Sequence, residues 1–481
     1  MHLPVNGSLG FYGVGGIIRR IHSVDRRAHS NLLPSMNLSF ESPVQFQLAQ
    51  TPEPKDAPSD RPRGAPQAQQ RWMALVILLA FGWRMIGLIA RKLGQVEETT
   101  IQLAARPMDE TVGALVIPGQ NGTIYYLLIR PWLQFFGTDL FALRYFSVLT
   151  SAIAIALMWQ VARRMVPAVG STLLRNLPLL STLFLAFNPL QLWYSQEGGR
   201  YALVVTLALF STWGWLQAMW YSGYMRWLSY LLITSIAIYT QVMTALLLPV
   251  HLVWFLLANP LNRQRWKGYG LTLVGFTLPI LPLTAWGRGL LAGAVNGVDQ
   301  QSSSALQSVV SDLAATPLAE IARTLLLSNA QGLLNPISHF WLIPIFFLGL
   351  TGLLVGYTEF GGRIANVGML ATWLILPVLL LYGISLVAPI FSGPTAQIGE
   401  GAARFEGVIW IAPAFTMFVA LGTQVMRRAY GRVGNWLAVG LIIFVVMFWG
   451  YRWWDHAQRP INIQSGAAES SLHAWRGYLE L

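Results

Sequence analysis

The sequence predicts an all-α polytopic membrane protein of about 11 transmembrane helices, from two observations on its composition and patterning. Hydrophobic residues make up 54% of the 481 residues and charged residues only 11%, whereas charged residues form about a quarter of a typical soluble chain. The apolar residues also gather in blocks of roughly 20, the helical length that crosses a hydrocarbon core of about 30 Å. Because backbone groups in lipid must bond to one another, each block is expected to be a helix.

The first of these blocks follows a polar amino-terminal segment. Residues 1–70 contain Pro, Ser and Gln with mixed charge and no sustained periodicity, which is typical of a disordered cytoplasmic tail. A start codon at Met73 is the alternative. The expected spans lie at about 72–90, 145–162, 177–193, 201–221, 227–241, 243–258, 270–286, 340–357, 365–389, 408–426 and 435–451.

The apolar run at 227–258 has two interpretations. A single helix of that length would reach about 48 Å, which exceeds a hydrocarbon core of about 30 Å. Arg226 precedes the run, and Arg263, Arg265 and Lys267 follow it. Short cytoplasmic loops are rich in Arg and Lys, so both ends are expected on the cytoplasmic side. This favours two helices that cross and return.

The same rule sets the orientation of the whole chain. With the amino terminus inside, the short loops on the cytoplasmic side carry Arg, and almost every acid after the first span falls on the opposite side, with Glu359 as the exception. Acids contribute little to membrane insertion, so topology does not explain their segregation. We expect residues 71–454 to be a multi-pass domain of the cell (plasma) membrane, residues 455–481 to be a short extracytoplasmic tail, and carboxylate chemistry to occur at the outer face.

Two outer segments are long enough to hold helices of their own. The first outer loop, about 91–144, contains an aromatic-rich run at 124–136 that is too short to span. It is expected to lie in the membrane interface with its aromatic rings at headgroup depth. The fourth outer loop, about 287–339, contains apolar residues at roughly helical spacing over 305–327, which predicts a second interfacial helix.

Several functional classes are disfavoured. The net charge of +12 could suggest nucleic-acid binding. Only three of the 32 basic residues are lysines, and many arginines flank apolar blocks, which is a topological pattern. The seven histidines form no metal-binding cluster, there are no cysteines, and no nucleotide-binding glycine motif occurs in a strand–helix context. We therefore expect no nucleic-acid partner, no dedicated metal site and no certain cofactor, and leave a divalent cation open.

The first candidate for chemistry is the pair of adjacent acids Asp109 and Glu110 in the first outer loop. A carboxylate at the membrane surface can deprotonate a hydroxyl group or orient it. The structural alternative is that adjacent acids cap a helix or face water.

The second candidate follows the third expected span, where the chain turns through Gly198 and Gly199 and places Glu197 and Arg200 at the outer surface. An arginine there could hold a phosphate with its planar fork of donors. The alternative is an interfacial Glu–Arg pair that anchors a tight turn.

Two further arginines are candidates for phosphate contact. Arg84 lies inside the first expected span, where a charge is costly unless it reaches the interface or a polar site. It is interpreted either as extending to the outer interface or as facing a lipid phosphate. Arg404 precedes the tenth expected span.

Three stretches of the chain resemble the GT-C superfamily of membrane glycosyltransferases, and most closely the bacterial branch of family 39, which is similar to dolichyl-phosphate-mannose protein mannosyltransferases. The resemblance covers about residues 72–260. The stretches are Met108-Asp-Glu-Thr111, the run from Asn121 to Trp132 followed by Ala142-Leu-Arg-Tyr-Phe-Ser147, and the run from Asn188 to Glu197 that continues to Tyr201-Ala-Leu203.

This resemblance implies an inverting transfer from a polyprenyl-phosphate sugar to a lipid, glycan or protein hydroxyl, with Asp109 as the base and Glu110 beside it. It also makes Tyr125 and Tyr201 candidates for substrate binding. Two positions depart from the family pattern. Gly122 and Thr123 stand where the family usually has two prolines, and the arginine after the Ser-Gln-Glu motif is Arg200, one position later than usual.

Two other functions stay open at this stage. A transporter or flippase would keep ionisable residues near the bilayer midplane, but the expected spans after the first contain no acid and no lysine. An envelope polysaccharide polymerase or ligase would share the outer arginines and lipid-linked substrates, and would move a whole glycan instead of one sugar.

Overall fold

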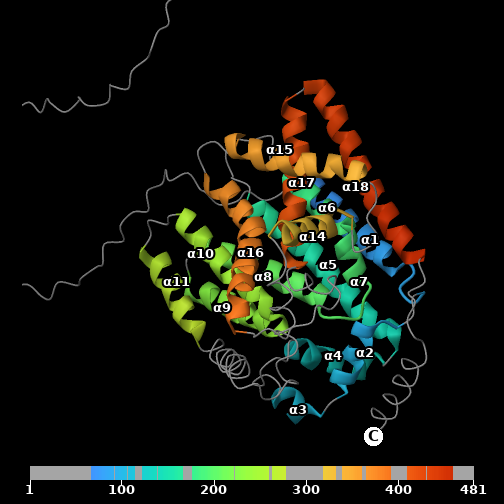
Figure 1. Ribbon diagram of the computed structural model, residues 1–481, viewed down its shortest axis with the longest axis vertical. Coiled ribbons are helices and arrows are strands. Elements are labelled where there is room, and N and C mark those ends of the chain that lie inside the picture. Colours follow the sequence, from blue (N-terminus) through green and yellow to red (C-terminus); the bar gives the residue numbers. More distant parts are fainter. Residues whose placement is uncertain are drawn as a thin grey trace, which may run out of the picture. The chain divides into compact units, whose positions relative to one another are not determined.

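The computed structural model describes one part of the chain as a set of helices (Figure 1). Contacts divide the chain into two units, Met1–Ser59 and Asp60–Leu481, and all described residues belong to the second. They form helices and no strand, which confirms the predicted all-α class. The described residues are 67–90, 93–105, 107–113, 122–137, 139–165, 176–221, 223–258, 263–277, 318–331, 339–359, 364–391, 409–429 and 431–458.

The helices follow the apolar blocks of the sequence, with short helices between them at one end. In chain order they are α1 (Gln67–Met85), α2 (Gln95–Ala104), α3 (Met108–Gly113), α4 (Thr123–Phe136), α5 (Leu140–Met165), α6 (Leu177–Phe187), α7 (Pro189–Ser195), α8 (Tyr201–Tyr221), α9 (Tyr224–Thr240), the 3₁₀ helix η2 (Val242–Leu246), α10 (Leu247–Ala258), α11 (Arg263–Gly275), α14 (Leu318–Gln331), the 3₁₀ helix η3 (His339–Leu342), α15 (Ile343–Glu359), α16 (Ile364–Phe391), α17 (Ala412–Ala429) and α18 (Gly431–Gln458).

Four of the described helical stretches are long and apolar enough to cross a membrane, and four shorter helices are also apolar. The long ones are Leu140–Met165, Tyr201–Tyr221, Ile409–Arg427 and Gly431–Trp454. The shorter ones are Leu177–Phe187, Val242–Ala258, Phe340–Gly352 and Gly368–Gly383. Several membrane-length helices therefore exist, and the number of about 11 crossings stays a prediction.

The expected span at 177–193 is wrong as a single helix, because the chain breaks between α6 and α7. Pro189 has no backbone N–H and cannot continue the hydrogen-bond ladder of α6. Asn188 ends α6 with an extended backbone, and its side chain accepts a hydrogen bond from the backbone N–H of Gln191 at 3.1 Å. The same side chain donates to the carbonyl of Asn329 on α14 at 2.8 Å, so both its polar atoms are used.

The run at 227–258 forms two helices, as the flanking charges favoured. Gln241 has extended backbone angles, φ −152° and ψ 112°, and ends α9 before η2 leads into α10. The expected interfacial run at 124–136 coincides with the helix α4. Of the second expected interfacial helix, residues 318–327 form the first part of α14, and residues 305–317 lie outside the described part of the chain.

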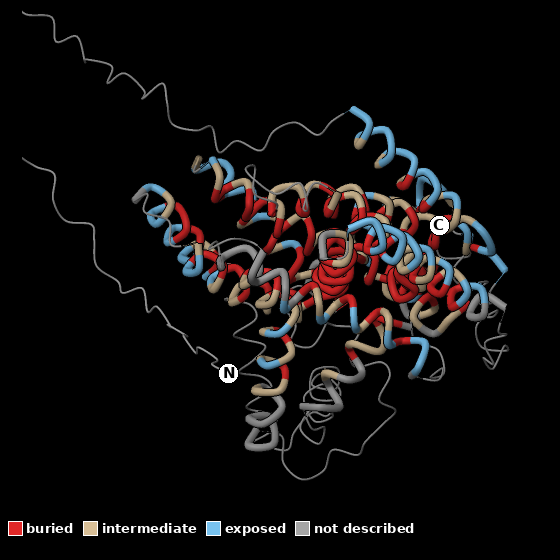
Figure 2. The backbone as a smooth tube through the Cα atoms, turned by 90° about the horizontal axis from the view of Figure 1, so that it is seen from above, coloured by how far each residue is buried: buried red, intermediate tan, exposed pale blue. Residues whose placement is uncertain are grey.

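Small residues allow close packing in the middle of the helices. A Cβ atom on Gly422 of α17 would collide with the backbone carbonyl of Leu348 on α15, and one on Gly352 would collide with that of Phe418. The two backbones therefore touch, which is how helices associate in lipid when apolar burial alone does not favour contact. Figure 2 shows the buried residues gathered where the helices pack together and the exposed residues on the helices at the edge.

The outer surface of α18 has the pattern of a lipid-facing helix. Trp436 and Trp454 are 78% and 52% exposed, and Val439, Ile443 and Met447 are exposed between them. The two tryptophans are separated by roughly 27 Å at 1.5 Å per residue, close to the thickness of a hydrocarbon core. Tryptophan favours the two membrane interfaces, so α18 is expected to cross the bilayer between these rings.

The α15–α17 contact makes a prediction about stability. Gly422→Ala should lower the free energy of unfolding by about 1–3 kcal/mol, because the added methyl group must push two backbones apart. Thermal melting of the purified protein in detergent measures this. The matched control is Gly440→Ala on α18, where a Cβ would meet nothing within 4 Å. Equal melting temperatures for the two variants would contradict the close contact.

The crossing of α18 can be tested with nitroxide labels, because the chain has no cysteine and single cysteines can be introduced cleanly. Power-saturation measurements in liposomes should find the highest oxygen accessibility at Ile443→Cys. They should find shallower positions at Trp436→Cys and Trp454→Cys, since the last two sites are expected at the interfaces. Comparable exposure of all three labels to a water-soluble relaxation agent would show that α18 does not span.

Candidate functional site

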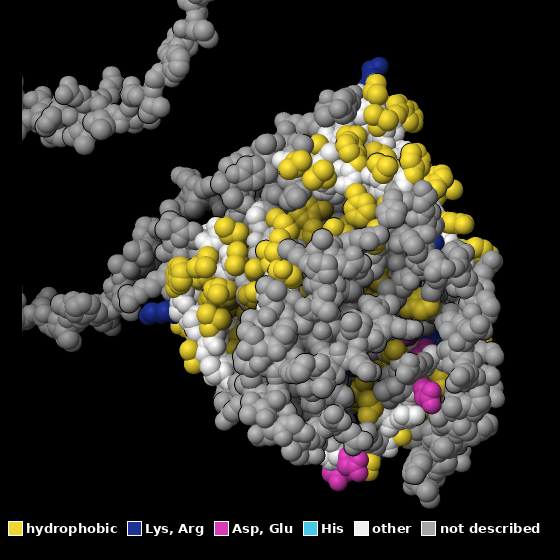
Figure 3. All heavy atoms as spheres, viewed as in Figure 1, with side chains coloured by type: hydrophobic (Ala, Val, Ile, Leu, Met, Phe, Trp, Pro, Cys, Tyr) yellow, Lys and Arg dark blue, Asp and Glu magenta, His cyan; other side chains and the backbone are white. Residues whose placement is uncertain are grey.

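The short helices α2, α3 and α4 lie together at one end of the described helices (Figure 1). Helices α2 and α3 both contact α4, and α4 in turn contacts α5. In Figure 3 the visible hydrophobic side chains cover faces around α10, α11 and α18, while the visible acidic side chains lie toward the end that carries α3. The first expected outer loop is therefore a small helical layer with acids on its surface.

Asp109 and Glu110 lie in the first turn of α3, a helix of six residues, and both are exposed. Acids at this position interact favourably with the positive end of a helix dipole, which fits the alternative that the two acids cap a helix. Their exposure also leaves the carboxylates accessible to a substrate. The structure is compatible with both interpretations, and the role of the two acids as a base stays a prediction.

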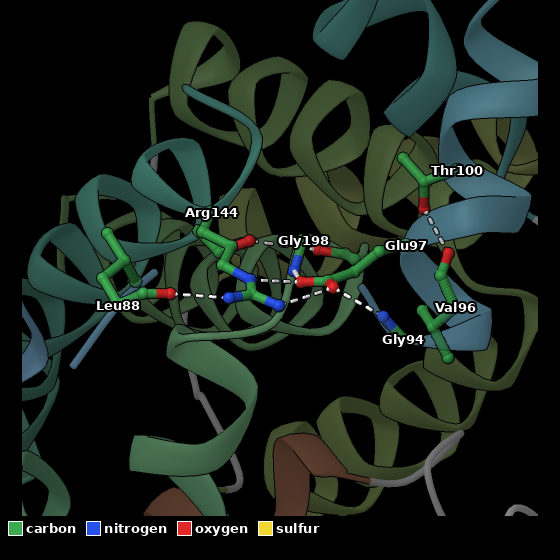
Figure 4. A network of polar contacts seen from close by, with 9 residues as sticks. Leu88, Gly94, Val96, Glu97, Thr100, Arg144 and Gly198 are labelled. Atoms are coloured by element: carbon green, nitrogen blue, oxygen red, sulfur yellow. Dashed lines mark hydrogen bonds and ion pairs between the residues drawn. The ribbon is translucent and has the colours of Figure 1, made fainter. Parts of the chain in front are cut away.

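A buried ion pair joins α2 of this layer to α5 (Figure 4). The guanidinium of Arg144 on α5 donates from Nε to Oε1 of Glu97 at 2.6 Å and from Nη2 to Oε2 at 2.8 Å. Its Nη1 donates to the carbonyl of Leu88 at 2.6 Å. Both side chains are only 2% exposed, so the pair is removed from water and held in the two-pronged geometry that makes such bonds strong.

Two backbone amides complete the surroundings of the Glu97 carboxylate. Gly94 donates to Oε2 at 2.9 Å, and Gly198 donates to Oε1 at 2.9 Å. Gly198 also requires the absence of a side chain, because a Cβ there would collide with Leu143. This tight fit brings the Gly198–Gly199 turn against α2 and α5.

Sequence reasoning placed Glu97 among the outer acids and Arg144 within a family motif, and proposed neither as a site residue. The available signal was an arginine at the start of an apolar run, which needs a partner when buried. Nothing in the spacing of the chain identifies that partner, since the two residues are 47 positions apart.

The structure brings together four of the expected site residues. The guanidinium of Arg200 lies 5.6 Å from the ring centre of Tyr201. Tyr125 on α4 is within electrostatic range of Glu197 and Arg200, and also of Glu97. Burial, followed by these carboxylates and Tyr126, raises the pKa of the Tyr125 phenol well above its ordinary value. The phenol is therefore a neutral hydrogen-bond donor at physiological pH.

The hydroxyl of Tyr125 is fully buried and has no hydrogen-bond partner among the described residues. A buried polar atom without a partner costs about 1–3 kcal/mol, which makes it a candidate for contact with water or a ligand.

The two departures from the family pattern meet at one place in the structure. Gly122 has φ +97°, a left-handed conformation that proline cannot adopt, so the usual proline is incompatible with this start of α4. A Cβ on Gly122 would lie 3.1 Å from Nη1 of Arg200. The space left by the missing side chain is thus occupied by the shifted arginine.

Arg84 does not join this cluster. Its side chain is fully buried between α1 and α5, donating from Nε to Ser151 Oγ at 3.0 Å and from Nη1 to the carbonyl of Ala80 at 3.1 Å. Ser151 thus provides a polar partner for Arg84 inside the helices, and the interpretation that Arg84 extends to the outer interface stays a prediction. Its Nη2 atom has no partner among the described residues, and phosphate contact stays a prediction. Arg404 lies outside the described residues.

Gln196 connects the turn before α8 to two other helices. Its Nε2 donates to the carbonyls of Arg84 at 2.9 Å and Ile86 at 3.0 Å. Its Oε1 accepts a hydrogen bond from Trp453 Nε1 on α18 at 3.0 Å. One amide therefore holds the end of α1, the turn and α18 together.

No group of three or more acidic or histidine side chains able to hold a metal ion occurs within the described ranges. The acids at this end differ in their surroundings. Glu97 is buried in an ion pair with Arg144, whereas Asp109 and Glu110 are exposed on α3.

Comparison with known proteins identifies the fold. No protein-family model and no curated protein sequence matches the chain. The apo oligosaccharyltransferase of Archaeoglobus fulgidus superposes with a TM-score of 0.51 at 12% identity, covering 85% of this chain and 59% of its own. The same archaeal enzyme, AglB, with an inhibitory peptide and a dolichol-phosphate gives 0.53 at 11% identity, with the same coverage. ArnT from Cupriavidus metallidurans gives 0.46 at 13% identity, covering 86% of this chain and 76% of its own.

The described helices thus share the all-helical fold of this archaeal oligosaccharyltransferase. This chain spans about 59% of the length of the archaeal enzyme. At this identity the likeness shows the fold alone, so the expected membership of the GT-C superfamily and of family 39 stays a prediction.

The contacts of Gln196 make a prediction about stability. Gln196→Leu should destabilise the protein by at least about 1–3 kcal/mol, because Trp453 Nε1 and two carbonyls would be left buried without their partner. Thermal melting in detergent measures the loss. Gln102→Leu serves as the control, since Gln102 is exposed on α2. Melting temperatures that agree for both variants would contradict the linking role of Gln196.

Proposed function

We propose that the protein is an inverting glycosyltransferase of the cell membrane, which moves a sugar from a polyprenyl-phosphate donor to a hydroxyl acceptor on the extracytoplasmic face. The observation that carries the proposal is the exposed position of Asp109 and Glu110 on α3, which contacts the helix that carries Tyr125. The side chain of Arg200, which precedes α8, reaches Gly122 at the start of α4. A GT-C fold that presents a base and a phosphate-binding arginine around one helix fits this reaction.

The chemistry is a single displacement. The carboxylate of Asp109 takes the proton of the acceptor hydroxyl, whose oxygen forms a bond to the anomeric carbon from the face opposite the leaving group. The bond between that carbon and the phosphate oxygen breaks, and the lipid phosphate leaves with the electron pair. Attack from the opposite face inverts the configuration at the anomeric carbon.

The leaving phosphate needs positive charge and hydrogen-bond donors. Arg200 offers a planar guanidinium, which suits phosphate better than a lysine does. The protonated Tyr125 hydroxyl, buried and without a partner among the described residues, offers a neutral donor. We assign the remaining expected residues Glu197, Tyr201, Arg84 and Arg404 to donor or substrate binding as predictions.

The archaeal enzyme of similar fold was solved with a dolichol-phosphate, which supports a polyprenyl-phosphate as the donor carrier here. It was also solved in a complex with Zn and sulfate, so a divalent cation stays a candidate cofactor for this protein. Sugar transfer from a synthetic polyprenyl-phosphate donor should therefore be measured both with added divalent cations and with a chelator.

A second candidate function follows from the same likeness. The archaeal protein is an oligosaccharyltransferase, so a transferase that moves a whole lipid-linked glycan is the competing proposal. The mass of the product separates the two, because one reaction adds a single sugar and the other adds the entire glycan. The acceptor would be a lipid, a glycan or a protein hydroxyl in either case.

The proposal requires a defined sidedness. The amino terminus should be cytoplasmic, the carboxyl terminus extracytoplasmic, and α3 should emerge on the outer side with the acids. A cysteine introduced at Gln102, which is exposed on α2, should react with a membrane-impermeant reagent from outside the cell. Labelling only from the cytoplasmic side would exclude the proposed function.

The role of Asp109 can be tested by transfer activity. Asp109→Asn should lower kcat/KM by about 100-fold or more, because general-base catalysis typically contributes that much. The assay uses the full chain in lipid nanodiscs with synthetic polyprenyl-phosphate hexoses and pentoses, and mass spectrometry of the product. Glu98→Gln on α2 is the control, because it removes a nearby acid outside the proposed site and should stay within about twofold of the parent protein.

If Glu110 replaces Asp109 as the base, the single variant retains activity and only Asp109→Asn combined with Glu110→Gln removes it. Full transfer by that double variant would refute the base assignment altogether.

A further inference from the structure

The Glu97 carboxylate is the meeting point of three segments that are far apart in the sequence. It accepts two hydrogen bonds from Arg144 on α5, one from the amide of Gly94 before α2, and one from the amide of Gly198. Figure 4 shows Gly94 and Gly198 on different sides of the carboxylate, with Arg144 facing it. All of these donors are directed at a group that is 2% exposed.

A buried carboxylate is stable only when its charge is compensated. Removing two opposite charges from water costs several kcal/mol per ion, and good geometry with further hydrogen bonds offsets that cost. Here the two-pronged Arg144 contact supplies the opposite charge, and the Gly94 and Gly198 amides bind the remaining lone pairs. The conformation of the Gly198–Gly199 turn is therefore coupled to the contact between Glu97 and Arg144.

This turn leads directly to Arg200. Gly199 has little space around it, because a Cβ there would approach Val96 of α2 to 3.0 Å. Ser147 of α5 donates to the carbonyl of Gly199 at 3.4 Å. The turn is thus held by α2 on one side and by α5 on the other, and Arg200 leaves it toward Gly122.

We propose that Glu97 and Arg144 are positioning residues, which set the place of Arg200 relative to the acid-bearing loop so that the donor phosphate and the base face one substrate. This inference rests on the proposed function and goes beyond it in naming the pair that aligns the site. Neither residue touches substrate: Glu97 acts through the Gly198 amide, and Arg144 acts through Glu97.

The KM for the donor distinguishes positioning from a merely structural role. A variant that only reduces the amount of folded protein lowers the maximal rate and leaves KM unchanged. Glu97→Gln removes the charge that holds the turn, so it should raise the donor KM by about fivefold or more in nanodiscs with a synthetic polyprenyl-phosphate sugar. Glu98→Gln, the adjacent acid on α2, should leave KM within about twofold. A loss confined to the maximal rate would overturn the proposal.

A double-mutant cycle tests whether the effect passes through Arg200. Residues that act through one another are not additive. In an Arg200→Gln background, Glu97→Gln should therefore raise the donor KM by less than about twofold. Fully multiplicative effects of the two substitutions would show that Glu97 acts independently of Arg200 and would refute the proposal.

Hydrogen–deuterium exchange provides a measurement that does not depend on activity. The amide of Gly198 is bonded to Glu97, so the peptide over residues 196–203 should exchange faster in Glu97→Gln than in Glu98→Gln. Arg144→Lys keeps the charge but loses the two-pronged contact, and it should show the same direction of change. If Glu97→Gln fails to fold, Arg144→Lys is the variant used in its place.

The two proposals fail separately. If the parent protein transfers no sugar from any donor, the proposed function fails, and the exchange of residues 196–203 still decides whether the pair holds the turn. Unchanged exchange in both Glu97→Gln and Arg144→Lys would overturn the positioning role, whatever the activity of the parent protein.

Discussion

The contact between the Glu97 carboxylate and the Arg144 guanidinium, each only 2% exposed, is the interaction on which the end of the protein that carries α2, α3 and α4 depends. Apolar contacts tolerate small shifts, but Glu97 must receive its donors at hydrogen-bonding distance or remain a costly charge in a medium of low dielectric constant. Because those donors come from α5, from the start of α2 and from the Gly198 turn, three segments share one geometry. Gln196, in the same turn, links it by hydrogen bonds to α1 and α18.

The helices farther from that end are held together differently. Between α15 and α17, Gly352 and Gly422 let the backbones touch, so dispersion and close packing replace polar contacts. The protein therefore combines closely packed helices with a layer of short helices, α2 to α4, that is aligned by charge. This layer and the adjacent turn carry most of the expected site residues, whose positions must be held more accurately than apolar burial alone achieves.

Much of the fold could be predicted from hydropathy, because the period and length of apolar blocks reflect the medium that surrounds them. The division of 227–258 was predicted from flanking arginines, and α4 from its aromatic run. The break at Asn188 was not predicted, although an Asn-Pro pair favours a turn, because apolar residues continue on both sides of it.

The candidate site was less accessible to sequence reasoning. Adjacent acids and a glycine turn are local patterns, whereas the partner of Arg144 and the enclosure of Arg84 by Ser151 depend on which helices become neighbours. The Gly122 departure had a physical cause that only backbone angles reveal, and it coincides with the shift of Arg200.

The discontinuity between α6 and α7 has a mechanical consequence. α6 has 11 residues and rises only about 16 Å, so its end at Asn188 falls well short of the span of a hydrocarbon core. Since Pro189 interrupts the hydrogen-bond ladder, α7 does not continue the direction of α6, and it packs instead against α5, α14 and α18. The direction in which the chain approaches the Gly198–Gly199 turn is thus independent of the direction of α6.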